Sequence, residues 1–184
     1  PPEWTSISMP YSGFFVLRSG WERDAFWMML DVGPFGRAHQ HEDKLNLLLH
    51  ANGRLLLTEG GNYAYDASEM RQYVLSTRAH NTVRVDGEDQ NRRAHYHWQA
   101  EDIDRRCEAI WQENDDAIFL SGSYTDGYGY QAANKVTHTR KVIWIKNHPI
   151  LSPFLLVIDE LKPADPKLHH YELLWHPTSD TVHK

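Results

Sequence analysis

Asn52-Gly53 lies between two apolar runs, at 44–51 and 54–58. Both central residues of a two-residue type I′ turn need positive φ, and Asn-Gly is the pair that best meets this requirement. The sequence therefore predicts a tight antiparallel hairpin here, and any fold that contains it contains an antiparallel sheet.

Short β-rich runs recur along the rest of the chain, separated by turn residues roughly every ten positions. This spacing is typical of an antiparallel sandwich or barrel, and we expect an all-β antiparallel sandwich. The expected strands are 14–17, 25–31, 45–50, 54–58, 82–85, 118–122, 142–145 and 154–159.

Three other stretches complete the expected architecture. Residues 66–75 combine a capping residue with apolar positions at Met70, Tyr73 and Val74, which predicts one short helix over 67–75. The polar segment 86–99 favours a turn followed by a loop or edge strand. Residues 168–175 alternate like a strand but no closing hairpin follows, so we expect further strands beyond this chain. Without repeats or a linker-like segment, residues 1–184 are predicted to form a single sandwich domain of a longer protein.

Composition argues against several classes of function. The net charge is −6 and no basic run is long enough to bind nucleic acid. The longest apolar runs are strand-sized, well short of the ~18 residues of a membrane helix. Cys107 is the only cysteine, which excludes an internal disulfide and a cysteine zinc site. The chain has 12 histidines, seven Trp, nine Tyr and six Phe, which favour a metal or proton-transfer site and a sugar-like or planar ligand.

His39 and His41 point to the same side if their segment is extended, because side chains alternate with period two. Glu59 follows the second hairpin strand and precedes Gly60-Gly61, while His80 lies just before an expected strand. Two imidazoles and a carboxylate form a donor set that suits zinc. Spacing alone leaves the alternative that these are surface or hydrogen-bonded histidines. In a regular hairpin Glu59 would lie opposite Asn46, so the segment before residue 44 must curl back for His41 to reach Glu59.

Several motifs in order resemble the heparinase II/III-like polysaccharide lyases. They are Gly36-x-x-His39-x-His41-x-Asp43, the 51–54 turn, Glu59-Gly60-Gly61, Tyr63-x-Tyr65 and the run 76–90. The resemblance is closest over 13–90 and continues more weakly to the end, where 157–160 is similar to the family's sandwich strands.

The resemblance implies a two-part enzyme, in which an N-terminal helical (α/α) toroid precedes a large β-sandwich that this chain is similar to. Such enzymes cleave uronate-containing polysaccharides or oligosaccharides, heparan-like or alginate-like, by β-elimination, and much of the acid/base work belongs to the toroid. The sandwich's catalytic contribution maps to His39, and a structural zinc site maps to His41, Glu59 and His80. Relatives commonly have Asp-Pro-Gly where this chain has Glu59-Gly60-Gly61.

Tyr63 and Arg78 are predicted to bind substrate because they flank the expected metal ligands, since arginine pairs with carboxylate or sulfate and tyrosine stacks on sugars. Tyr65 and Arg71 are considered for the same role, with packing or solvation as an equal alternative. The strand tryptophans Trp27, Trp144 and Trp175 are expected in the core, and His95 and His97 in a loop without a role.

Two other functions compete with the lyase. A non-catalytic carbohydrate-binding or structural sandwich would hold glycan with the same aromatic and basic residues. A cupin-type metalloenzyme also carries His-x-His on a barrel strand, but cupins place a glutamate several residues further on, where this chain has 45–47 Leu-Asn-Leu. By resemblance to exported bacterial lyases, a periplasmic or secreted location is expected.

Overall fold

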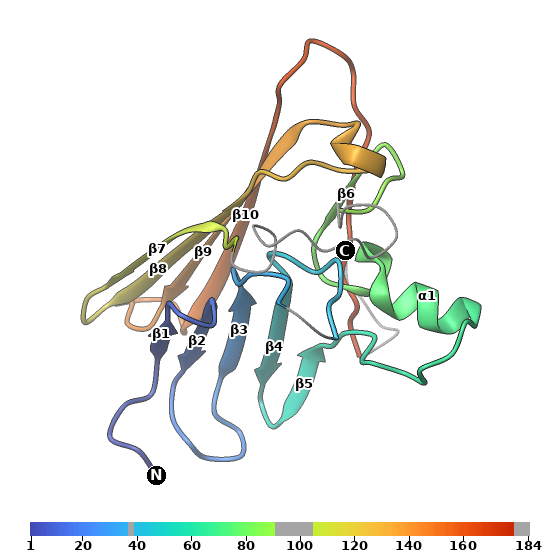
Figure 1. Ribbon diagram of the computed structural model, residues 1–184. Coiled ribbons are helices and arrows are strands. Elements are labelled where there is room, and N and C mark those ends of the chain that lie inside the picture. The colour runs from blue at the N-terminus through green and yellow to red at the C-terminus, as the bar shows by residue number, and fades with distance from the viewer. Residues whose placement is uncertain (37–38, 91–104, 179–184) are drawn as a thin grey trace.

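The computed structural model describes residues 1–36, 39–90 and 105–178, and it consists mainly of antiparallel sheets (Figure 1). The five-stranded sheet has the order β1-β2-β3-β4-β5, with β1 Ile7–Met9, β2 Phe14–Arg18, β3 Trp27–Asp31, β4 Leu47–Ala51 and β5 Arg54–Leu57. The four-stranded sheet has the order β10-β9-β8-β7, with β7 Glu108–Glu113, β8 Ala117–Tyr124, β9 Val136–Ile145 and β10 Phe154–Pro163. A small sheet pairs β6 Val83–Val85 with β11 Tyr171–Leu173.

The core lies between the two large sheets and follows from the period-two alternation of their strands. The inward residues of the central strands are Phe15 and Leu17 of β2, Met28 and Leu30 of β3, Ile118 and Leu120 of β8, and Val142 and Trp144 of β9, and all of them are buried in one cluster. The predicted antiparallel sandwich is therefore confirmed.

The predicted hairpin is present as β4 and β5. Asn52 and Gly53 have φ of 54° and 73°, as a type I′ turn requires. The register shifts by a bulge between Leu49 and His50, so the pairs run Ala51 with Arg54 and Leu49 with Leu57. The hairpin ends at Leu57, and Glu59 emerges two residues beyond its strand.

Helix α1 spans Glu69–Leu75 and confirms the predicted helix with a later start (Figure 1). Ser68 is its N-cap, because the Ser68 hydroxyl accepts a hydrogen bond from the Arg71 N–H at 3.2 Å. Val74 and Leu75 are its buried residues, whereas Met70, expected among the apolar contacts, is exposed. Two 3₁₀ turns, η1 Thr77–Ala79 and η2 Tyr130–Ala132, are also present.

Several strand predictions need correction. Strands β1 and β7 were not predicted, and the last strand, predicted over 168–175, covers only Tyr171–Leu173 as β11. After β11 the chain pairs with the edge of β5, since Thr58 N–H donates to His176 O at 3.0 Å and Thr178 N–H donates to Leu56 O at 3.2 Å. The small sheet is thereby tied to the five-stranded sheet.

Other expectations fall partly outside the described residues. Of the segment 86–99, residues 86–90 form a turn with two isolated bridges, Glu88 with Val85 and Gln90 with Tyr128. Residues 91–99, with His95 and His97, lie outside the described residues. Trp144 is buried and Trp175 packs against the core, but Trp27 is partly exposed beside His50 and does not belong to the core cluster. No helix in the described part of the chain is long and apolar enough to span a membrane.

Candidate functional site

The loop between β3 and β4 carries His41, and its next residue Glu42 contacts the last residue of helix α1. Leu45 adopts φ of 64°, and its N–H donates to Asp31 O at 2.8 Å, which reverses the chain just before β4. Upstream, Glu42 N–H donates to Leu75 O at 2.9 Å and the Thr77 hydroxyl donates to Glu42 O at 2.8 Å. These bonds make the curl that the hairpin register requires.

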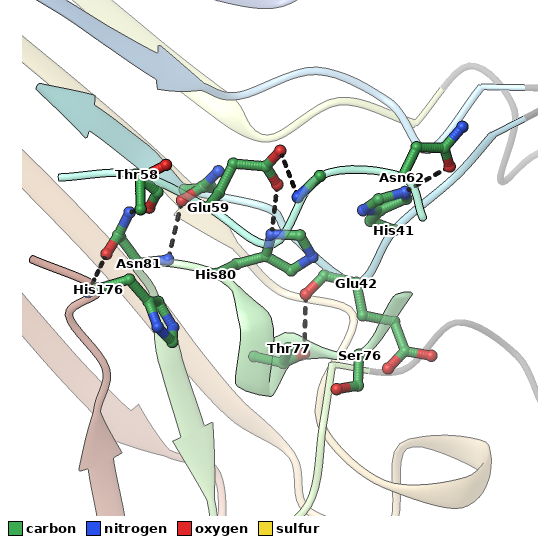
Figure 2. A network of polar contacts seen from close by, with 12 residues as sticks. His41, Glu42, Thr58, Glu59, Asn62, Ser76, Thr77, His80, Asn81 and His176 are labelled. Atoms are coloured by element: carbon green, nitrogen blue, oxygen red, sulfur yellow. Dashed lines mark hydrogen bonds and ion pairs between the residues drawn. The ribbon is translucent and has the colours of Figure 1, made fainter. Parts of the chain in front are cut away.

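His41, Glu59 and His80 converge on one point (Figure 2). One ligand atom from each of the three lies within 4.8 Å of the others. The His41 and His80 rings have centroids 5.2 Å apart, and His80 Nδ1 lies 3.1 Å from Glu59 Oε2. Ligands on a tetrahedral zinc with bonds near 2.0 Å are about 3.3 Å apart, so the last pair is already at that separation.

Glu59 is positioned by the two glycines that follow it. Gly60 N–H donates to Ala79 O at 3.2 Å, and a Cβ on Gly60 would lie 3.0 Å from Ala79 Cβ and 3.3 Å from Val74 Cγ1. Gly61 has φ of 66°, and its N–H donates to Glu59 Oε1 at 3.0 Å. One carboxylate oxygen is thus held by the backbone while the other faces His80.

His80 follows η1 and is fully buried, and its neighbour Asn81 fixes the backbone there. The Asn81 side-chain amide donates to Leu47 O at 2.9 Å and Thr58 O at 2.6 Å, and its Oδ1 accepts from His176 N–H at 2.6 Å (Figure 2). Asn81 therefore joins β4, the end of β5 and the C-terminal segment around the triad. Sequence reasoning did not assign it a role.

The local electrostatics favour the forms of these side chains that bind metal. Contact with the His80 imidazole holds the pKa of the Glu59 carboxyl below its usual range, and the Gly61 N–H adds to this against the effect of burial. Burial, followed by the nearby His80, lowers the pKa of the His41 imidazole. An ionised carboxylate and a neutral imidazole are the states that ligate a cation.

The residues present fit a bound metal ion. Both ring nitrogens of His80 are buried; Nδ1 pairs with the Glu59 carboxylate, whereas Nε2 has no hydrogen-bond partner in the described structure. A buried polar atom left unpaired is costly, and a cation shared with Glu59 and His41 would satisfy it. On its other side, His41 Nε2 lies 3.4 Å from Asn62 Oδ1 (Figure 2), and metal-binding histidines commonly donate their second ring N–H in this way.

His39 lies outside this triad and is exposed. It adopts φ of 62°, so the segment is not extended and the period-two argument for His39 and His41 does not describe it. The Tyr65 hydroxyl lies 2.9 Å from His39 Nδ1, with the rings edge to face at 5.5 Å, and Asn62 Nδ2 lies 3.4 Å from the same nitrogen. His39 and His41 thus flank the Asn62 amide from two sides.

The four residues considered for substrate binding separate into two pairs. Tyr63 is exposed with φ of 52°, and Arg78 is exposed with its guanidinium 5.7 Å from the Tyr73 ring centre. The contacts that the structure describes for His39 involve Tyr65 and Asn62, and Arg71 lies over the Tyr65 ring at 4.9 Å. The structure therefore brings Tyr65 and Arg71 to His39, and it does not give Tyr63 or Arg78 a contact there.

The family described as heparinase II/III-like, C-terminal, matches residues 1–184. The chain belongs to the heparinase II/III-like family. A heparin-sulfate lyase of Bacteroides stercoris is 27% identical over 164 residues, which are 87% of this chain and 21% of that protein. A heparin-sulfate lyase of Pedobacter heparinus is 29% identical over 92 residues, 48% of this chain and 14% of that protein.

Solved structures of this heparinase group share the fold. The heparan sulfate lyase of Pedobacter heparinus superposes with a TM-score of 0.57 at 20% identity, covering 78% of this chain and 24% of that one. Heparinase III superposes with a TM-score of 0.57 at 18% identity, covering 84% and 22%. The chain thus spans about a fifth of the first relative's length and about a quarter of the first solved structure.

Proposed function

We propose that the full polypeptide carrying these residues cleaves heparin- or heparan-type glycans by β-elimination at a uronate. A base removes the proton from the carbon next to the carboxylate, the electron pair forms a double bond, and the bond to the C4 oxygen breaks as that oxygen takes a proton. The matched relatives are heparin-sulfate lyases, which favours a glycosaminoglycan over alginate.

The arrangement of His39 carries the proposal. An exposed imidazole that contacts a tyrosine hydroxyl lies two residues from a His/Glu/His cluster in which His80 is buried and His41 and Glu59 are half-buried. An imidazole can donate or accept a proton near neutral pH, and it can oppose charge that develops on the uronate. The other acid/base groups of the reaction are assigned to an N-terminal helical toroid, so these 184 residues alone are expected to be inactive.

We further propose that His41, Glu59 and His80 hold a zinc ion with a structural role. When bound, the ion would cross-link the β3–β4 loop, the end of β5 and the residue that follows η1, which are far apart in the chain. The buried Nε2 of His80, which has no hydrogen-bond partner in the described structure, supports this assignment. Glutamate is a competent zinc ligand, and Glu59 already presents Oε2 to His80 despite the longer side chain.

His39→Ala in the full polypeptide tests the function. The wild type should produce the ultraviolet absorbance of an unsaturated uronate from heparan sulfate or heparin, with alginate as the comparison polymer. Losing a general acid/base group should lower kcat by on the order of 10²- to 10⁴-fold. His170→Ala, at an exposed histidine of the β10–β11 loop, is the matched control and should keep wild-type activity.

Two results would contradict the lyase assignment. One is a folded full-length wild type that gives no absorbance from any of these polymers. The other is a His39→Ala variant that changes glycan binding but leaves turnover intact, which is the outcome expected of a non-catalytic carbohydrate-binding sandwich. The structure does not support the cupin alternative, because His39 and His41 lie in a loop and not on a barrel strand.

A further inference from the structure

Three side chains outside the triad form a continuous chain of contacts that ends at His39. Arg71 Nη1 lies 2.8 Å from Asn62 Oδ1 and also contacts Asn62 O. Asn62 Nδ2 lies 2.8 Å from the Tyr65 hydroxyl, and that hydroxyl lies 2.9 Å from His39 Nδ1 against 3.5 Å from His39 Nε2. Arg71 lies in helix α1, whereas Asn62, Tyr65 and His39 lie in loops.

The chemistry of the donors gives this chain of bonds a direction. A guanidinium can only donate, so the atom of Asn62 that faces Arg71 must be its carbonyl oxygen. The opposite end of the amide is then NH₂, which can only donate, and the Tyr65 oxygen accepts from it. The single hydroxyl proton of Tyr65 remains for its other close partner, His39 Nδ1.

A second contact supports the same direction. The Asn62 NH₂ group also lies 3.4 Å from His39 Nδ1. Two donors, the amide N–H and the tyrosine O–H, therefore converge on one ring nitrogen. That arrangement is favourable only if Nδ1 carries a lone pair, because an N–H there would face both donors.

We propose that Arg71, Asn62 and Tyr65 are positioning residues that hold His39 with Nδ1 as an acceptor, so that its N–H is on Nε2. This inference rests on the proposed lyase function for its consequence. The neutral His39 meets the glycan as a hydrogen-bond donor, suited to the anionic uronate or the departing oxygen, and proton removal from carbon falls to another group. The same Asn62 amide contacts His41, so the cluster and His39 share one support.

Asn62→Asp tests the direction of the relay, because both carboxylate oxygens can still accept from Arg71 and from His41 but neither can donate. Tyr65 should then donate to Asp and accept from His39, which moves the His39 proton to Nδ1. The full polypeptide, labelled with ¹⁵N-histidine, is measured by NMR at about pH 8, above the usual imidazole pKa of about 6.5. The His39 signal is identified by its loss in His39→Ala.

The expected result is the Nε2–H tautomer in the wild type and the Nδ1–H tautomer in Asn62→Asp. Asn114→Asp, an exposed asparagine whose Oδ1 accepts from the Asp116 and Ala117 N–H groups, is the control and should leave His39 unchanged. An Nδ1–H wild type, or the same tautomer in wild type and Asn62→Asp, would overturn the proposal. This readout does not depend on turnover, so it is separate from any failure of the lyase assignment.

Tyr65→Phe gives a second test that keeps the ring beneath Arg71 and removes only the hydroxyl. Loss of a hydrogen-bond partner that orients a functional histidine typically lowers activity about 10- to 100-fold. We therefore expect kcat to fall by about that factor, with KM and metal content little changed. Tyr130→Phe, at an exposed tyrosine of η2, should match the wild type. Wild-type kcat in Tyr65→Phe, or an equal loss in Tyr130→Phe, would also overturn the proposal.

Discussion

Among the residues that the structure describes, two fully buried histidines are paired with carboxylates, and their surroundings differ. His138 Nε2 lies 2.7 Å from Asp159 Oδ1, and Arg140 donates to the same carboxylate through Nε at 2.7 Å and Nη2 at 3.0 Å. His80 Nδ1 lies 3.1 Å from Glu59 Oε2, and the His41 ring lies beside the His80 ring with 5.2 Å between their centroids. In the described chain Arg140 also pairs with Asp159, and we call His138, Asp159 and Arg140 the closed network. No described lysine or arginine is paired with Glu59, and we call His80, Glu59 and His41 the open network.

This difference separates a structural network from a site that can take a ligand. Arg140 balances the Asp159 charge, donates to Leu45 O and Asn81 O, and lies 4.9 Å from the Trp175 ring centre. Glu59 keeps 28% of its side chain exposed, and it faces the His80 imidazole, whose Nε2 has no hydrogen-bond partner in the described structure. Because Arg140 holds the backbone of Asn81, next to His80, the closed network also supports the open one.

The largest expected effect comes from breaking the closed network with Arg140→Met. Removing one partner of a buried ion pair leaves an uncompensated charge and should cost about 3–5 kcal/mol in the free energy of unfolding. Urea unfolding of the full polypeptide measures it, with Arg54→Met on the exposed start of β5 as the control. A loss below about 1 kcal/mol, which is typical of a surface pair, would contradict the distinction drawn between the two networks.

Metal removal should have the next largest effect on stability, and it should act only through the open network. An ion at 100 times its Kd stabilises the folded state by about 2.7 kcal/mol, so a chelator should lower the Tm of the wild type. In His41→Ala the Tm should start lower and not respond to the chelator. Equal responses in both proteins would mean that the ion binds elsewhere.

Acidification should lower the stability contributed by the closed network, and this effect should be smaller. Burial raises the pKa of Asp159, but hydrogen bonds from His138 and Arg140 and the charges of these two residues outweigh it and lower the pKa from 3.8 to about 2. Its stabilisation is therefore fully present above pH 3.8 and is lost as the pH falls through about 2. By the linkage of pKa to stability it amounts to roughly 2 kcal/mol.

Asp159→Asn should remove this part of the acid transition. Urea unfolding at pH values between 2 and 5 compares the slope of stability with pH in the variant and the wild type. The same slope in both proteins would show that another carboxylate controls the acid limb.

The sequence predicted what local patterns determine and missed what distant segments build. Asn52-Gly53 requires positive φ at both residues, which no distant contact has to supply, so the hairpin could be predicted. By contrast, β7 is an edge strand with polar residues such as Glu108 and Gln112, and it has little apolar alternation of its own. Its pairing with β8 depends on the neighbour.

The site shows the same division. The triad was implied by the family's motifs, whereas Tyr63 was favoured over Tyr65 from proximity along the chain. The positive φ of Tyr63 breaks the extended backbone, so the rule that alternate residues share a face does not hold there. Asn81 acts through contacts with segments that are 23 to 95 residues away, and Asn62 acts through contacts with the imidazoles of His39 and His41. Neither asparagine carries a sequence signal for such a role.

Elemental analysis of the full polypeptide, purified without chelators, tests the central claim most directly. The account predicts one zinc ion per chain in the wild type and none in His41→Ala, with both proteins folded by circular dichroism. A folded wild type without metal, or a His41→Ala variant that retains it, would contradict the assignment of His41, Glu59 and His80 as a metal centre.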